Sequence, residues 1–321
     1  MRRTGLLLFL ARRVVALIGV LVAMSFVIFL FLYLSPGSVE QTLLGPRELT
    51  PEAVAAIRHQ YHLDQPFLVQ YLDWAKGAVR FDFGHSILSN EAVTTIIARR
   101  LSLSLQLAGL AFAFALAVGV PLGLLAALRR RTSVDRAMVG FSVVGISAPA
   151  FATGILLLYV FAVRLGWFPV FGQGSGVANR VWHLALPATA LGLTGMGLFL
   201  RLTRAGTAAA LEQDYVAFAR ARGVARGRIL RAYVLRNALV PIVTAGGLIL
   251  AYLIAGAVLV EVTFALPGVG SLLVDSITAK DIPVVQGLAM LIAFTVVVIN
   301  LLIDLLYLAI DPRIGFEAGR A

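Results

Sequence analysis

The sequence predicts an all-α polytopic membrane protein with six transmembrane helices. Hydrophobic residues make up 60% of the 321 residues and charged residues only 13%, and the mean hydropathy is +0.92. Ordinary soluble domains do not reach such values. Six stretches stay apolar over roughly the 20 residues that a helix needs to cross a bilayer. These stretches are continuously apolar, whereas the strands of a membrane barrel alternate between polar and apolar residues, so helices are predicted.

The six predicted spans follow one another along the chain. The first is longer than the apolar region of a cleavable signal peptide, and no small-residue cleavage site follows it, so we expect a retained anchor. The fourth is short and rich in glycine, which leaves its ends poorly defined. The spans are Val14–Leu34, Leu103–Leu128, Ala137–Val163, Leu184–Phe199, Ala238–Val260 and Val284–Ile310.

The distribution of basic residues predicts the orientation. With the N-terminus inside, 18 of the 27 lysines and arginines face the cytoplasm, as the positive-inside rule expects. Trp74, Trp167 and Trp182 then fall on the outer side, where indole rings anchor helices at the interface. We expect a multi-pass membrane protein with both termini in the cytoplasm. Because the excess positive charge follows this topology, nucleic-acid binding is not predicted.

Residues 36 to about 100 form one long outer segment. Thr50 before Pro51 is a typical helix start and predicts a helix through His59. Apolar residues at helical spacing predict a second helix between Phe67 and Val79. We therefore expect residues 1–100 to combine the first span with a folded outer segment, residues 101–312 to form a core with five spans, and residues 313–321 to form a cytoplasmic tail.

A basic amphipathic insert, residues 201–236, separates the fourth and fifth spans and contains eight arginines. Such an insert lies on anionic lipid or docks a soluble partner. Gly223 favours docking, because glycine costs a surface helix about 1 kcal/mol relative to alanine and therefore marks a turn between two helices. The predicted apolar ridge consists of Tyr215, Phe218, Ala219, the stem of Arg222, and Val224.

This insert resembles the cytoplasmic EAA loop of ABC-importer permeases. Ala217, Phe218 and Ala219 stand at the E-A-A positions, and Gly223 stands at the glycine. Arg236 occupies the position of the usual proline, and Pro241 follows it in LRNALVP, which resembles the dipeptide, oligopeptide and nickel branch. Four further segments resemble the same branch. They are HLDQPFLVQYLDW and RFDFGHSI in the outer segment, FALPGVGSLLVDSI before the last span, and DPRIG near the C-terminus.

The resemblance implies a type I ABC-importer permease fold and a permease that conducts di- or oligopeptides, with nickel chelates and glutathione left open as substrates. It implies three kinds of partner besides membrane lipid: a homologous second permease subunit, two ATP-binding-cassette ATPase subunits, and an extracytoplasmic solute-binding protein. It also implies that the chain lies in a bacterial or archaeal inner or plasma membrane. The residues implied to couple the chain to the ATPases are Asp214, as a helix cap or anchor, with Tyr215, Phe218, Ala219, Gly223 and Arg236.

The chain carries no phosphate-binding loop of the form G-x-x-x-x-G-K-[ST]. Its two lysines, Lys76 and Lys280, are followed by glycine and aspartate. Hydrolysis is therefore expected from separate subunits, and neither enzyme activity nor a cofactor is predicted for this chain. The absence of cysteine excludes disulfides and thiolate metal sites.

Other classes of protein stay open as alternatives. A stand-alone secondary transporter would use the insert to bind lipid, and Asp304 is its plausible intramembrane ionisable group. A membrane-embedded serine protease would need Ser175 and His183 to meet within hydrogen-bond reach. His59 and His62 lack a third ligand nearby, so a metal site is not predicted.

Glycine and proline inside the spans predict close packing and kinks. Gly119 and Gly123 lie four residues apart, a spacing that lets two membrane helices approach closely. Pro149 and Pro187 would kink the third and fourth spans. All four are predicted packing residues, with gating of the pathway as a second hypothesis.

Overall fold

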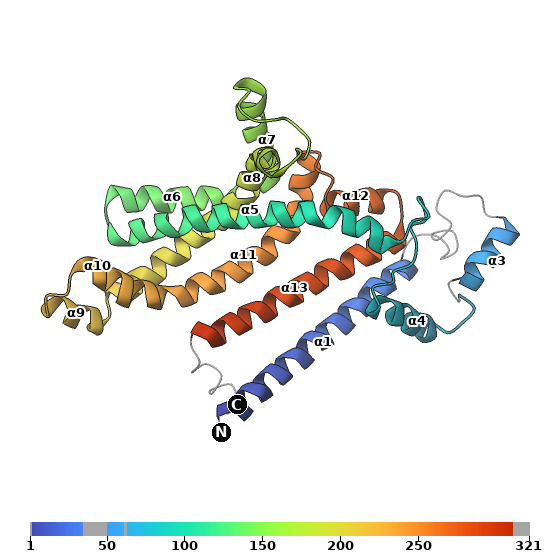
Figure 1. Ribbon diagram of the computed structural model, residues 1–321, viewed down its shortest axis with the longest axis horizontal. Coiled ribbons are helices and arrows are strands. Elements are labelled where there is room, and N and C mark those ends of the chain that lie inside the picture. The colour runs from blue at the N-terminus through green and yellow to red at the C-terminus, as the bar shows by residue number, and fades with distance from the viewer. Residues whose placement is uncertain (1, 35–49, 61–62, 311–321) are drawn as a thin grey trace. The chain divides into compact units, whose positions relative to one another are not determined.

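The computed structural model describes residues 2–34, 50–60 and 63–310, and these residues are helical almost throughout (Figure 1). The chain divides into two compact units. One consists of residues 1–104 and 267–298, and the other of residues 105–266 and 299–321. The expected boundary near residue 100 remains a prediction, and residues 267–298 group with the N-terminal part of the chain.

The first unit gathers the N-terminal helices and part of the C-terminal region. Its elements are α1 (Arg2–Leu34), α3 (Pro51–Gln60), α4 (Phe67–Val79), the start of α5 (Val93–Leu128), α12 (Val269–Thr278) and the first part of α13 (Ile282–Ile310). Aromatic rings pack α4 against α1, since Phe29 lies 5.5 Å from Phe67, 5.7 Å from Tyr71 and 5.6 Å from Trp74 between ring centroids. Helix α4 is therefore attached to α1 by aromatic contacts.

A buried carboxylate joins the start of α13 to the loop before α5 in the same unit. Asp281 is only 2% exposed. Its carboxylate accepts hydrogen bonds from the Ser86 hydroxyl and, at 3.1 Å, from the backbone N–H of Ile87. A cluster of buried apolar residues packs nearby: Val93, Ile97, Val269, Leu272, Val284 and Leu288. The GHSI sequence thus contributes two donors to a buried acid.

The second unit is built around α8 (Val177–Leu211), whose middle is almost entirely buried. Helices α6, α7 and α11 pack against it. The remaining elements follow in order: the end of α5, α6 (Ser133–Ser147), α7 (Ala150–Leu157), the π-helical η1 (Leu158–Arg164), α9 (Asp214–Ala221), α10 (Arg226–Arg228), the π-helical η2 (Ile229–Leu235) and α11 (Arg236–Thr263).

The predicted third span is not a continuous helix. Helix α6 ends at Ser147 and α7 begins at Ala150, with a bend of 104° between the two halves. Pro149 causes this break, because proline lacks the N–H and forces the preceding residue out of the helical region; Ala148 accordingly has φ −78° and ψ 123°. The described residues therefore contain five helices able to cross a membrane, or six if the bent pair is one span.

The predicted fourth span is much longer than expected. Helix α8 extends it at both ends and continues through Pro187, which is buried. The predicted all-α polytopic class is confirmed. The predicted kink at Pro149 in the third span is a complete break between α6 and α7.

Gly119 and Gly123 of α5 lie against α8. A Cβ atom on Gly119 would stand 2.6 Å from the Met196 carbonyl oxygen, and one on Gly123 would stand 2.5 Å from that of Leu200. Real Cβ atoms do not approach so closely. Only glycine therefore allows the two helix backbones to reach this separation.

Candidate functional site

The insert, residues 201–236, begins inside α8 and ends at the first residue of α11. Helix α8 runs to Leu211, and Glu212 caps it. Helices α9 and α10, drawn in gold, lie beyond the neighbouring ends of α8 and α11 (Figure 1). The part of the insert outside the long helices is thus a short helix, a turn and the π-helical η2.

Gly223 forms the turn that ends α9. Its N–H donates to the Arg220 carbonyl at 3.0 Å, and the Val224 N–H donates to the Ala219 carbonyl at 3.1 Å. This pair of bonds is the Schellman arrangement, which requires a left-handed residue. Gly223 has φ +73°, a conformation that side-chain-bearing residues rarely adopt. The turn is therefore set by local sequence.

The insert has a small hydrophobic core of its own. Val216 and Ala219 of α9 are buried against Ile229 and Val234 of η2 and against Ala210 of α8. Leu211, Val224 and Leu230 pack at its margin. Because the two halves of the insert bury apolar surface against each other, its shape does not depend on contact with lipid.

The predicted apolar ridge divides between two faces, which corrects the expectation of one outward ridge. Ala219 and Val224 face the internal core, so the close approach at Ala219 is to η2. Phe218 points outward and is 68% exposed. Tyr215 is 38% exposed and stacks on Tyr233, with the centroids 6.3 Å apart and an interplanar angle of 24°.

The buried residues of the insert were not predicted from the sequence. Val216 lies three positions before Ala219 and so shares its side of the helix. This spacing could have predicted that Val216 is buried. Ile229 and Val234 were missed as well, and their partnership with α9 depends on the turn. Five exposed arginines follow Phe218 in the sequence: Arg220, Arg222, Arg226, Arg228 and Arg231.

Two predicted coupling residues, Asp214 and Arg236, each begin a helix. Asp214 is not the N-cap of α9, because Gln213 occupies that position, without a side-chain cap bond. Asp214 is the first helical residue, where an acid still interacts favourably with the helix dipole. Arg236 begins α11, and its side chain lies outside the described residues.

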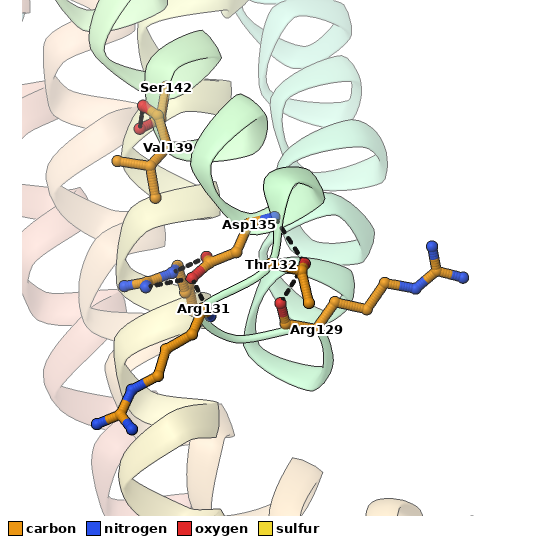
Figure 2. A network of polar contacts seen from close by, with 7 residues as sticks. Arg129, Arg131, Thr132, Asp135, Val139 and Ser142 are labelled. Atoms are coloured by element: carbon orange, nitrogen blue, oxygen red, sulfur yellow. Dashed lines mark hydrogen bonds and ion pairs between the residues drawn. The ribbon is translucent and has the colours of Figure 1, made fainter.

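An ion pair joins α6 to α8 at the base of the insert. The Arg204 guanidinium donates through Nε to Asp135 Oδ1 at 2.6 Å and through Nη2 to Oδ2 at 2.9 Å. The Arg131 backbone N–H also donates to Asp135, at 3.0 Å (Figure 2). The Asp135 N–H donates in turn to the Thr132 hydroxyl, which caps α6 (Figure 2). A planar guanidinium that meets both carboxylate oxygens fixes orientation as well as distance.

A second ion pair lies one residue beyond the end of α8. Arg130, in the turn between α5 and α6, pairs with Glu212. Both side chains are largely exposed, so this pair contributes at most about 1 kcal/mol. Together the two pairs connect the α5–α6 turn to α8 and to its junction with α9, an arrangement suited to transmitting movement.

A cavity of about 510 Å³ opens beside the turn. Its walls include Leu128, Leu211, Ile229 and Leu230, with Arg220 and Arg226 contributing the charged groups. Such a hollow can receive an apolar side chain next to an acidic one.

The other singled-out residues have ordinary surroundings. His183 Nδ1 lies 2.8 Å from the Asn179 carbonyl of its own helix, and in the described part of the chain no hydrogen bond links it to Ser175. His62 and the His59 side chain lie outside what the structure describes. Among the described residues, no group of three or more histidines and acids could hold a metal. Asp304 is half-buried near the end of α13.

Comparison with known families identifies the chain. Residues 119–316 match the inner membrane component of binding-protein-dependent transport systems, and residues 6–108 match the N-terminal part of the membrane component of such systems. The chain belongs to this family. The resemblance found in the insert is thereby confirmed for the chain as a whole.

Relatives within the family match almost end to end. A probable peptide ABC transporter permease of Sinorhizobium fredii is 39% identical over 96% of this chain and 99% of its own. A putative peptide transport system permease of Brucella abortus is 38% identical over 95% and 98%. A glutathione transport system permease of Escherichia coli is 37% identical over 96% and 99%.

The fold is that of a known ABC transporter. The inward-facing MetNI methionine ABC transporter has a chain that superposes with a TM-score of 0.55 at 16% identity, covering 67% of this chain and 96% of that one. By its family and its relatives, the chain is a permease subunit of an ATP-driven importer, and its fold is the type I fold. This membership decides against a stand-alone secondary carrier, and the relatives above are all named as permeases.

Proposed function

We propose that this chain forms the membrane pathway of a peptide importer and that its insert is the surface on which an ATPase subunit docks. Two of the relatives above are named for peptide transport, and the third for glutathione, itself a tripeptide. Short peptides are thus the substrate class that these relatives have in common.

The exposed ring of Phe218, on the preformed helix α9, is the main observation behind the docking proposal. The internal core holds α9 and η2 together before any partner arrives, which lowers the entropy lost on binding. Exposed aromatic residues are frequent anchors at the centre of interfaces. The exposed arginines of the insert, two of which (Arg220 and Arg226) line the hollow, favour a partner surface that carries acidic groups.

The ion pairs at the base give docking a mechanical consequence. Movement of α9 would act on Glu212 and Arg130, and movement passed to α8 would act on α6 through Arg204 and Asp135. Since α8 and α11 continue from the two ends of the insert, closure of an ATPase pair would displace both helices. Gly119, Gly123, Pro149 and Pro187 would then act as packing and hinge positions in the pathway.

The remaining parts of the importer follow from this assignment. The basic insert lies in the cytoplasm, as the positive-inside rule expects, together with both termini. Two ATPase subunits supply hydrolysis, because this chain has no phosphate-binding loop. A homologous permease completes the pathway, and an extracytoplasmic solute-binding protein delivers the peptide.

Replacement of Phe218 by alanine tests the docking surface. The tagged chain is purified from its native membranes in mild detergent, and the co-purified ATPase is quantified over a dilution series. Loss of a central aromatic anchor typically costs 2 kcal/mol or more, so we expect ATPase affinity to fall about 30-fold. Phe171→Ala is the matched control, since Phe171 is 75% exposed in the loop between η1 and α8 and should retain the ATPase.

Equal recovery of ATPase with Phe218→Ala and with the parent chain would contradict docking through this face. If the insert instead binds lipid, Phe218→Ala would leave ATPase recovery unchanged. It would weaken the binding of the purified chain to anionic vesicles.

A further inference from the structure

A second cavity, of about 520 Å³, lies between the first turns of α8 and the adjoining part of α5, within the second unit. Its volume falls in the range of about 300–1,000 Å³ that small-molecule sites occupy. Its walls include Gln106 and Leu110 from α5, and Arg180 and Leu184 from α8. None of these residues belongs to the insert.

Arg180 is the charged residue in this wall. Its Nε atom is buried, and it has no hydrogen-bond acceptor among the described residues. Because Nε is covered by protein, a ligand in the cavity can reach only the other guanidinium nitrogens, and Arg180 forms no ion pair among the described residues. A guanidinium is matched best by a planar carboxylate, which accepts two parallel hydrogen bonds. A carboxylate on a ligand would therefore supply the anion that the described residues do not.

The rest of the cavity wall defines the body of that ligand. Val177, Val181 and Leu184 are apolar, and Gly109 and Gly176 add no side chain. Gly176 also has φ +74°, so a side-chain-bearing residue there would be strained. The cavity thus combines one cation with a mainly apolar wall, which fits a carboxylate attached to an apolar group.

We propose that Arg180 binds the C-terminal carboxylate of the transported peptide and that this cavity is a substrate subsite. This inference rests on the proposed peptide-import function. Arg180 is then a specificity-determining residue: it selects a free C-terminus, while the apolar wall accommodates varied side chains. An anionic lipid headgroup could also satisfy a guanidinium, and the experiment separates these two sources of negative charge.

The experiment measures ATP-dependent uptake by the complete importer in proteoliposomes. The probes are tritiated L-Ala-L-Ala-L-Phe with a free C-terminus and the same tripeptide as its C-terminal amide. The variants are Arg180→Gln and Arg180→Lys. Arg164→Gln serves as the matched control, because Arg164 is exposed at the end of η1 and lies over the Tyr159 ring, 5.7 Å from its centroid.

We expect the parent and Arg164→Gln to prefer the free acid by at least about tenfold, the usual scale for a lost hydrogen bond to a charged group. Arg180→Gln should take up acid and amide at similar rates, and Arg180→Lys should keep part of the preference. The ratio of the two rates is independent of how much variant is incorporated. Equal uptake of acid and amide by the parent, or an unchanged preference in Arg180→Gln, would overturn the inference.

Two further outcomes are also decisive. If Arg180→Gln lowers uptake of acid and amide by the same factor, the residue serves structure or lipid contact, and the inference fails while peptide import stands. If the parent chain shows no ATP-dependent uptake of either tripeptide, the proposed function fails, and the subsite fails with it.

Discussion

Asp135 and Arg204 form a two-point ion pair in which the carboxylate side chain is 6% exposed and the guanidinium side chain 30% exposed. The pair fixes the start of α6 to the last turns of α8, near the junction with the insert. Because it is mostly buried and makes two hydrogen bonds, its removal has consequences that the exposed pair of Arg130 and Glu212 does not share.

Replacing Asp135 by alanine should destabilise the protein strongly. It leaves Arg204 partly buried without its partner, and the loss of one member of a buried pair typically costs 3–5 kcal/mol. The measurement is the Tm of the purified chain in detergent, followed by tryptophan fluorescence. Arg136→Ala is the control, because Arg136 is exposed in the same turn of α6 and should leave Tm nearly unchanged.

The double variant Asp135→Ala/Arg204→Met should recover much of the stability lost in Asp135→Ala. Replacing both members of a buried pair by apolar residues is often close to neutral. The coupling energy from the double-mutant cycle measures the interaction. Strict additivity of the two single changes in Tm would mean that the pair contributes nothing as a pair.

Gly123→Ala should destabilise the packing of α5 on α8. The new Cβ would lie 2.5 Å from the Leu200 carbonyl oxygen, so the helices must separate, at a cost of about 1–3 kcal/mol. Gly109→Ala is a control in the same helix, because no atom lies within 4 Å of a Cβ there. If the two alanine variants have the same Tm, the close contact is not needed for stability.

Composition and hydropathy were sufficient to predict the membrane class and five of the long helices. A continuous apolar run inside a bilayer forms a helix because its backbone must satisfy its own hydrogen bonds. The break at Pro149 was predicted only as a kink. A proline restricts its neighbour locally, but the 104° bend between α6 and α7 depends on how both halves pack against α8 and how α7 packs against α11. Tertiary contacts of that kind cannot be predicted from one local stretch of sequence.

In the insert, the turn at Gly223 was predictable because glycine alone tolerates its conformation. The separation of Phe218 from Ala219 onto different faces was not, since it depends on which side of α9 meets η2. Arg180 was likewise missed as a site residue. A single arginine at a membrane interface is expected on topology alone, and only the cavity that Arg180 lines distinguishes it.

Substitutions at Gly223 should follow backbone strain rather than size. No atom lies within 4 Å of a Cβ at this position, but φ is +73°. Asparagine tolerates the left-handed region, whereas a β-branched residue is strained there. We therefore expect Gly223→Asn to keep the ATPase bound and Gly223→Val to lower its recovery, with a cost of about 1–2 kcal/mol in the turn.

Gly227→Val provides the control for this comparison. Gly227 lies in α10, also with open space around a Cβ, and its backbone is not left-handed. It should therefore tolerate valine better than Gly223 does. Equal loss of ATPase recovery in both valine variants would point to side-chain bulk at the docking face instead of strain in the turn.

Ser86→Ala should weaken the attachment of the loop before α5 to the start of α13. The Asp281 carboxylate would keep the Ile87 N–H but lose the Ser86 hydroxyl, and an unsatisfied buried acceptor costs about 1–3 kcal/mol. Tm should fall by several degrees, and Ser86→Thr, which retains a hydroxyl, should recover part of it. Ser89→Ala is the control, because Ser89 is exposed and only its backbone N–H donates to Ser86. Identical Tm values for Ser86→Ala and Ser89→Ala would show that the Ile87 N–H alone satisfies the buried carboxylate.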